Sequence, residues 1–258
     1  MAGVPAAAQE TLDVRLRPSL GALERGDFAQ AIDSLKPLAA QNIAEAQHLL
    51  ALALEGAPEA QRDLKAAHGW YLRAAEAGVL AAQNNLGAMY FDGRGVAQDF
   101  VQALAWYLRV ARSGHVDAQY NVALMYGRGQ GVERNDREMA RWLLPSAKAG
   151  SARAQAQLAR LYLDGDGVEQ NPTEAADWFR RAAESGHVHA QFYLAQLLQK
   201  GYGVERDLAR AHDWYLKAAD AGITEAMRAL AFIYESGLGV PADGIKARLW
   251  RERAQRPR

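Results

Sequence analysis

The 258-residue chain contains no cysteine, which excludes disulfide bonds, thiolate metal ligands and cysteine nucleophiles together. It also has no excess of charge of either sign, because 30 lysines and arginines balance 30 aspartates and glutamates. A nucleic-acid surface needs a clustered basic excess, so we expect no nucleic-acid partner. No apolar run reaches the roughly 20 residues of a membrane-spanning helix, so we expect no such helix.

The sequence also lacks the motifs of common enzyme classes. It has no Walker A loop, no G-x-S-x-G turn and no H-E-x-x-H helix. His187 and His189 have no third ligand in register, which favours capping or surface histidines over a metal site. Asp164 and Asp166 lack the remaining ligands of a calcium loop and predict a polar turn. We therefore expect no enzyme activity, no metal and no cofactor.

The first ten residues contain neither the charged leader nor the apolar core of an intact signal peptide. The small residues of V-P-A-A-A-Q suit the region just after a cleavage site. We predict that residues 1–10 are disordered or processed. The absence of cysteine is compatible with both the periplasm and the cytoplasm, so composition leaves the compartment open.

What the sequence does have is a repeat. Its six tryptophans stand 36 residues apart, at Trp70, Trp106, Trp142, Trp178, Trp214 and Trp250. A column of alanines keeps the same step from Ala46 to Ala226, and glutamine follows it in five of six repeats. A strict period of this length is typical of repeat proteins, whose units bury their apolar faces only against their neighbours.

Each unit is predicted to fold as two helices. In the first helix of one unit, Ala82, Leu86 and Met89 share one face at helical spacing. A G-x-G-V motif then ends that helix, since glycine adopts positive φ without strain. The second helix begins at an Asp or Asn seven residues before each Trp, whose side chain caps it. In two units Glu138 and Glu174 predict a full capping box. The tryptophans are predicted to be core residues.

These motifs resemble those of the Sel1-like repeat family, a relative of the tetratricopeptide repeat. The segments AQNNLGAMYFDGRGV and ALAWYLRVARSG carry the resemblance, which covers about residue 42 to the C-terminus. It implies an all-α fold, a right-handed α/α superhelical solenoid of 36-residue helix–turn–helix repeats. The first full unit has A-P-E-A at residues 57–60 in place of G-x-G-V, so its turn should differ.

We predict one solenoid domain. Residues 11–45 form a degenerate opening repeat, in which Asp27 takes the capping position. The six Sel1-like repeats that follow occupy residues 46–81, 82–117, 118–153, 154–189, 190–225 and, as the capping repeat, 226–255.

Function in a solenoid depends on the positions that the scaffold leaves free. After the repeat columns are removed, several aromatic, Asn and Arg side chains remain on the first helices, away from the core face. In the related tetratricopeptide fold the first helices line the concave surface. We therefore predict a partner-binding groove formed by Asn84, Asn85, Phe91, Tyr120, Asn121, Arg160, Phe192, Tyr193, Gln196, Arg228 and Phe232. Alternatively, some of these rings pack between neighbouring repeats.

The resemblance implies a non-enzymatic module that binds another protein and is monomeric when free. Some bacterial Sel1-like proteins are immunity proteins that neutralise a secreted toxin, including lipase effectors, in the periplasm. We expect such a role here, in the periplasm, because relatives built this way often follow a signal peptide. The alternatives are a scaffold of a cell-envelope assembly, which could bind a glycan, and a cytoplasmic location.

Overall fold

The computed structural model describes residues 14–255. Within this range the chain forms one short 3-10 helix and fourteen α-helices and no strand, which confirms the all-α repeat prediction. The elements are η1 Val14–Leu16, α2 Arg17–Glu24, α3 Phe28–Ala40, α4 Ala44–Gly56, α5 Leu64–Glu76, α6 Leu80–Asp92, α7 Phe100–Arg112, α8 Val116–Arg128, α9 Asp136–Lys148, α10 Ala152–Asp164, α11 Pro172–Glu184, α12 Val188–Lys200, α13 Leu208–Asp220, α14 Thr224–Ser236 and α15 Gly244–Gln255. The segment 1–10, predicted to be disordered or processed, lies outside the described residues.

The helices form pairs of nearly constant length. Every helix from α4 to α14 has 13 residues, and α15 has 12. Each first helix begins two residues before the column alanine of its repeat. The pair α2 and α3 precedes the six full repeats, and Asp27 caps α3 by accepting the backbone N–H of Gln30 at 3.0 Å.

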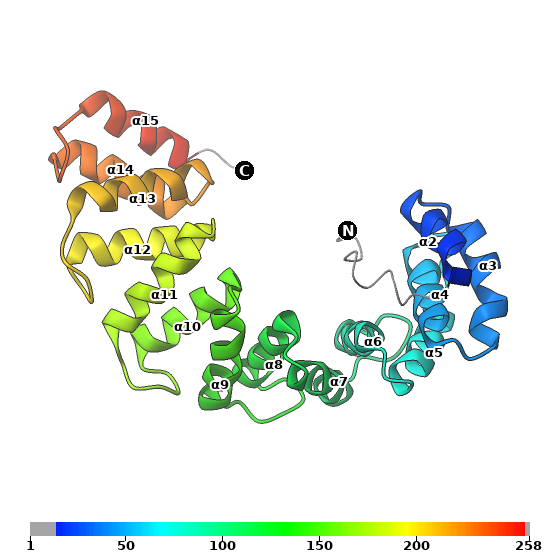
Figure 1. The fold of residues 1–258 in the computed structure, drawn as a ribbon. Helices are drawn as coiled ribbons and strands as arrows, with labels where there is room; N and C mark the ends of the chain where they lie inside the picture. Colours follow the sequence, from blue (N-terminus) through cyan, green and yellow to red (C-terminus); the bar gives the residue numbers. More distant parts are fainter. Residues whose placement is uncertain (1–13, 256–258) are drawn as a thin grey trace. The chain divides into compact units, whose positions relative to one another are not determined.

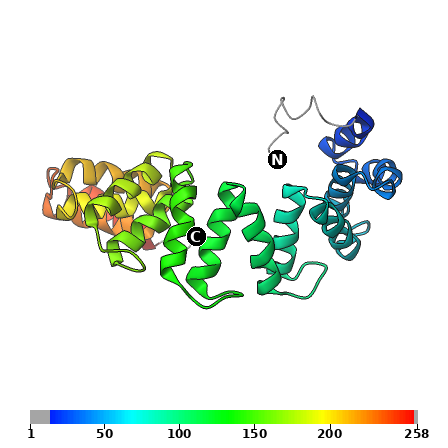
Figure 2. The ribbon, with the colours of Figure 1, turned by 60° about the horizontal axis from the view of Figure 1, so that its bottom comes forward.

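The chain contains two compact units, which are described separately below. Unit 1 comprises Met1–Ser113 and Gln130–Val132, and its described helices are α2 to α7. Unit 2 comprises Gly114–Gly129 and Glu133–Arg258, with helices α8 to α15. Within each unit a helix packs against the helix before it and the helix after it in the chain, as Figures 1 and 2 show.

The second helices begin at the predicted capping residues. In α9 the side chain of Asn135 accepts the backbone N–H of Glu138 at 3.0 Å. Equivalent caps are made by Asp63, Asp99, Asn171, Asp207 and Asp243. The full capping box is wrong, because the backbone N–H of Asn135 donates to the carbonyl of Tyr126 at 2.9 Å instead of to Glu138. The N–H of Asn171 is likewise bonded to Tyr162, so Glu174 does not close a box either.

The two glycines of the G-x-G-V turn meet different requirements. Gly201 ends α12 with a φ of 68°, in the left-handed region. Gly203 lies so close to the start of α11 that a Cβ would overlap the backbone of Pro172. The first full repeat lacks both glycines, and its helix α4 ends at Ala57 in extended backbone (φ −60°, ψ 153°). The prediction that this turn differs is therefore confirmed.

The column glutamine joins each repeat to the one before it. Gln155 is buried, and its Nε2 donates to the carbonyl of Ala147 at 3.0 Å, from α10 to the end of α9. Gln47, Gln83 and Gln191 make the same bond, each to the carbonyl eight residues earlier. The last carbonyls of a helix have no partner within it, so a buried one needs a donor from outside.

The tryptophan column lies at the edge of the core. Trp106, Trp178 and Trp250 are 7% exposed, and the other three are half-buried. A Lys or Arg one turn later covers the indole of Trp70, Trp106, Trp178, Trp214 and Trp250. The ring that fills the interior is often the next residue, as with Tyr71 and Phe179, which are fully buried. The core prediction thus holds in full for three of the tryptophans.

Candidate functional site

A recess opens on the side of unit 2 to which its first helices α8, α10 and α12 contribute. Its volume is about 370 Å³. We call it the α10 pocket, and its lining is formed by Tyr120, Arg153, Ala156, Gln157, Arg160, Phe179, His187, His189, Ala190 and Tyr193. The lining contains four Arg and His side chains and no acidic residue. It is therefore a polar, basic recess with an apolar floor.

The pocket exists because one column position changes from a ring to a methyl group. Two residues after the column alanine, α8 carries Tyr120 and α12 carries Phe192, whereas α10 carries Ala156. The small side chain leaves space that a ring would fill. The floor is closed by Phe179 and Tyr193, whose rings stack with centroids 5.1 Å apart.

The two arginines of the pocket differ in how they are held. Arg153 donates to Asp117 on α8 at 2.7 Å, and its guanidinium lies 4.8 Å from the ring centroid of Tyr120. Both side chains of this ion pair are more than half exposed, so the contact is screened by solvent and neutralises only part of the charge of Arg153. Arg160 is exposed and, among residues 14–255, has no ion-pair partner. Its guanidinium is thus an unpaired cation at the pocket.

His187 has a structural role at the pocket. Its Nδ1 accepts the backbone N–H of Ala190 at 3.2 Å and caps α12, so the neutral ring carries its proton on Nε2. Burial lowers the pKa of His187, and the neighbouring His189 lowers it further. The capping prediction is confirmed for His187. Within residues 14–255 no three side chains are placed together to hold a metal ion.

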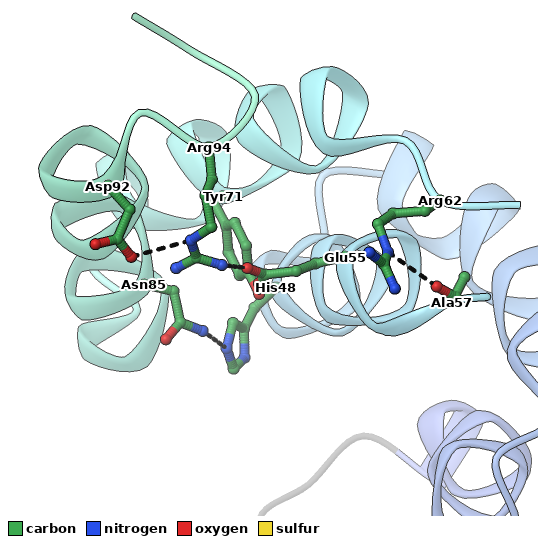
Figure 3. A network of polar contacts seen from close by, with 8 residues as sticks. All are labelled: His48, Glu55, Ala57, Arg62, Tyr71, Asn85, Asp92 and Arg94. Carbon is green, nitrogen blue, oxygen red and sulfur yellow. Dashed lines mark hydrogen bonds and ion pairs between the residues drawn. The ribbon is translucent and has the colours of Figure 1, made fainter. Parts of the chain in front are cut away.

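Unit 1 carries a different polar cluster on α4, α5 and α6 (Figure 3). The carboxylate of Glu55 accepts the hydroxyl of Tyr71 at 2.8 Å and pairs with Arg94. Arg94 also pairs with Asp92 at 3.1 Å. Burial raises the pKa of Tyr71, which keeps its phenol protonated as a donor. Each charged group drawn here has its partner, so the cluster is a closed network that joins two repeats.

His48 extends this network on α4. Its Nε2 lies 3.5 Å from the side-chain nitrogen of Asn85, as Figure 3 shows. Burial lowers the pKa of His48 to about 4, and the nearby charge of Glu45 opposes this shift only in part. The imidazole is therefore neutral at pH 7. Asn85, predicted as a groove residue, is a partner of this buried histidine.

The structure brings three of the predicted groove residues together in the α10 pocket: Tyr120, Arg160 and Tyr193. Two others, Arg228 and Phe232, are exposed on α14, and Phe232 has 57% of its surface accessible. Arg160 and Phe232 occupy the same column, six residues after the alanine. These five side chains remain candidates for contact with a partner.

The other predicted residues lie half-buried, several of them packed between helices. Phe91 meets the ring of Phe100 edge-on at 5.2 Å. Phe192 contacts the rings of Tyr193 and Tyr215. These two rings therefore pack within their own repeats, whereas the alternative of packing between repeats describes Tyr193, which stacks on Phe179 of the preceding repeat. Half-buried positions are also occupied by Asn84, Asn121 and Gln196.

Sequence reasoning missed four polar residues of the pocket: Arg153, Gln157, His187 and His189. The repeat pattern assigned His187 and His189 to caps or the surface, and Arg153 and Gln157 were not among the polar residues predicted to line the groove. A signal was present, because Asp117, Arg153 and His189 occupy one column immediately before the alanine. Opposite charges 36 residues apart in one column indicate neighbours on adjacent first helices.

The repeats, their caps and their consecutive packing define a class of protein, the helical repeat scaffolds. Six consecutive matches to the Sel1 repeat cover residues 44–79, 80–115, 116–151, 152–187, 188–223 and 224–254. The chain therefore belongs to the Sel1 repeat family. The repeats of this family are protein-interaction modules that form a scaffold for binding.

Two solved structures are similar over nearly the whole chain. A Sel1 repeat protein from Oxalobacter formigenes is 31% identical, with a TM-score of 0.77 over 95% of this chain and 98% of that one. The protective antigen c5321 of uropathogenic Escherichia coli, which displays an SLR fold, is 30% identical, with a TM-score of 0.87 over 96% of this chain. The chain spans 54% of the length of c5321.

A more distant match is the immunity protein PA5088 from Pseudomonas aeruginosa, at 21% identity and a TM-score of 0.45 over 82% of this chain and 80% of that one. Similarity at this level has no bearing on function. No curated protein matches the sequence. Among the described helices, none is both long and apolar enough to cross a membrane.

Proposed function

We propose that the protein is a non-enzymatic binding module whose partner protein lies against its first helices. In unit 2 the partner contacts the α10 pocket together with Arg228 and Phe232. The observation that carries this proposal is the unpaired Arg160 at an open pocket, with Phe232 exposed in the same column. Exposed Arg and aromatic side chains are the residues that most often dominate the energy of protein interfaces.

The test is affinity capture on the immobilised chain, with mass spectrometry of proteins retained from native lysate and secreted material. We expect one stoichiometric protein, retained by the wild type and lost with Phe232→Ala. Ile245→Ala is the matched control, since Ile245 is 85% exposed on the second helix α15. Equal loss with both variants would show that the partner does not use the first helices.

The narrower form of the proposal is that the partner is a secreted bacterial toxin, such as a lipase effector, and that the protein gives immunity in the periplasm. This form rests on the resemblance to bacterial Sel1-like proteins. A toxin captured in a one-to-one complex, and inhibited by the chain, would support it. Recovery of many envelope components, or of wall glycan alone, would instead support the second candidate, a scaffold of the cell envelope.

A further inference from the structure

We propose that the α10 pocket binds an acidic side chain of the partner protein, whose carboxylate is held by Arg160 and by the Nε2–H of His187. This inference rests on the proposed function and names the chemistry of its central contact. The ligand is an aspartate or glutamate within the partner's chain, docked with its methylene groups on the apolar floor.

The charge of the lining selects an anion. Arg153 and Arg160 are permanent cations, and no carboxylate belongs to the lining itself. Asp117 pairs with Arg153, and Arg160 has no counter-ion among the described residues. A carboxylate that enters the pocket therefore meets an excess of positive charge, whereas a lysine or arginine side chain is repelled.

One of the two donors, His187, is already in position before a ligand arrives. His187 is fixed as an N-cap, so its Nε2–H is a donor with a defined orientation. Arg153 contacts Asp117 and Tyr120, and keeps guanidinium N–H groups that this ion pair does not use. Donors held in place lose little conformational entropy on binding, which raises affinity.

The size of the pocket limits the ligand. A volume of about 370 Å³ lies at the lower end of ligand pockets, which span roughly 300–1,000 Å³. It accommodates a side chain or two of an extended segment rather than a whole helix. The half-buried rings of Tyr120 and Tyr193 offer an apolar surface for the methylene groups beside a carboxylate.

The experiment is an NMR titration of the full chain with synthetic peptides that are acetylated and amidated. The probe is GSGEEGSG, and its neutral counterpart is GSGQQGSG. We expect the glutamate peptide to shift the ring signals of His187 and the signals of Arg160, and to bind at least tenfold more tightly than the glutamine peptide. Binding should weaken as salt is added, because charges near the surface are screened.

Two variants test the site, and a third is the control. Arg160→Glu reverses the charge and should weaken binding of the glutamate peptide at least tenfold. Ala156→Leu fills the recess and should weaken binding of the same peptide by a similar factor. Arg248→Glu makes the same charge change at an exposed arginine on α15, outside the proposed contact surface, and should leave binding within twofold. Thermal melting of each variant checks that it is folded.

The outcomes separate this inference from the proposed function. Equal binding of both peptides, or stronger binding of GSGSGSGS with a free C-terminal carboxylate, would overturn the acidic side chain as ligand. A captured partner that binds Arg160→Glu as well as the wild type would overturn the inference and leave the proposed function standing. Failure of the wild type to capture any protein would overturn the proposed function and with it the partner as the source of the carboxylate, whereas the peptide titration decides separately whether the pocket prefers a carboxylate.

Discussion

At the scale of single residues, the buried glutamines show how a polar side chain is accommodated in an apolar core by a hydrogen bond. Each donates to a carbonyl near the end of the preceding helix, such as Gln155 to Ala147. The carbonyl of Ala147 also accepts the backbone N–H of Gly150 at 3.1 Å, so the glutamine adds a second donor, and this one comes from the next repeat. In the last repeat Met227 takes the glutamine's place and is half-buried. The glutamine recurs in this column because it makes a hydrogen bond between repeats. The sequence alone showed the recurrence but not the bond.

Replacing Gln155 by Met should lower the free energy of unfolding by about 0.5–1.5 kcal/mol, because the hydrogen bond between α10 and the end of α9 is lost while the carbonyl of Ala147 keeps the backbone N–H of Gly150. Denaturation in urea measures the change. The control is Gln196→Met on α12, a half-buried glutamine outside the column, which should cost less than about 0.5 kcal/mol. Similar losses in both variants would mean that the bond contributes nothing specific.

His48 should make stability depend on pH. Burial lowers its pKa from 6.5 to about 4 in the folded protein, so the unfolded chain takes up a proton first as the pH falls. Its contribution is complete above pH 6.5 and is lost between pH 6.5 and about 4. Since one pKa unit corresponds to about 1.4 kcal/mol, the loss approaches about 3 kcal/mol.

The measurement for His48 is the free energy of unfolding in urea at several pH values between 7 and 4. His48→Gln should flatten the profile in this window. Some slope will remain, because burial also lowers the pKa of His68 and of His187. Identical profiles for wild type and variant would show that His48 is not the titrating group.

At the scale of the helix and its turns, the structure explains why the G-x-G-V motif has two glycines. The first ends a helix in left-handed backbone, and the second lets the turn approach the second helix of the preceding repeat. In the repeat of α12, this approach places Gly203 against Pro172 at the start of α11. The turn thus reverses the chain and also makes a contact between repeats. Ending the helix alone would require only the first glycine.

Gly203→Ala should therefore be more damaging than Gly186→Ala. Both positions have positive φ, 72° and 85°, and any side chain there is strained by about 1–2 kcal/mol. Only at Gly203 does the new methyl group also overlap backbone, whereas a Cβ at Gly186 meets nothing within 4 Å. We expect Gly203→Ala to cost at least about 2 kcal/mol more in chemical denaturation. Equal losses of free energy of unfolding in the two variants would mean that the turn can move away from Pro172 without a penalty.

At the scale of the whole molecule, the formal net charge of zero means that any electrostatic preference comes from local clusters. In unit 1, Glu55 and Asp92 both pair with Arg94, and Arg62 donates to the backbone carbonyl of Ala57 (Figure 3). In unit 2 the α10 pocket has two arginines and one acidic neighbour in contact, Asp117. An acidic partner should therefore be drawn to unit 2 rather than to unit 1.

Partner binding should consequently depend on salt. Between 50 and 300 mM NaCl we expect the association rate of the captured partner to fall several-fold, because exposed charges are screened beyond about 10 Å at 0.1 M. Surface plasmon resonance on the immobilised chain measures the rate. Arg160→Glu should reduce the salt dependence, and Arg228→Glu should reduce it less if the pocket is the main contact. A rate insensitive to salt would contradict an electrostatic role.

The sequence by itself determined the elements of this protein. The 36-residue period, the capping Asp and Asn residues and the turn glycines predicted the helix pairs and their ends, because each of these signals acts within a few residues. The buried alanine column also followed from periodicity. The capping box failed because a backbone carbonyl, Tyr126 in α8, competes with the glutamate side chain for the same N–H.

Only the tertiary structure decided which free side chains meet. The α10 pocket depends on Ala156 being small where Tyr120 and Phe192 are large, and on residues that come from four helices. Tyr193, predicted as open surface, stacks on Phe179 of the preceding helix. Contacts of this kind join positions many residues apart, and their geometry depends on how successive repeats pack. Local sequence rules carry no information about how successive repeats pack against each other. For this reason the fold could be predicted from the sequence and the pocket could not.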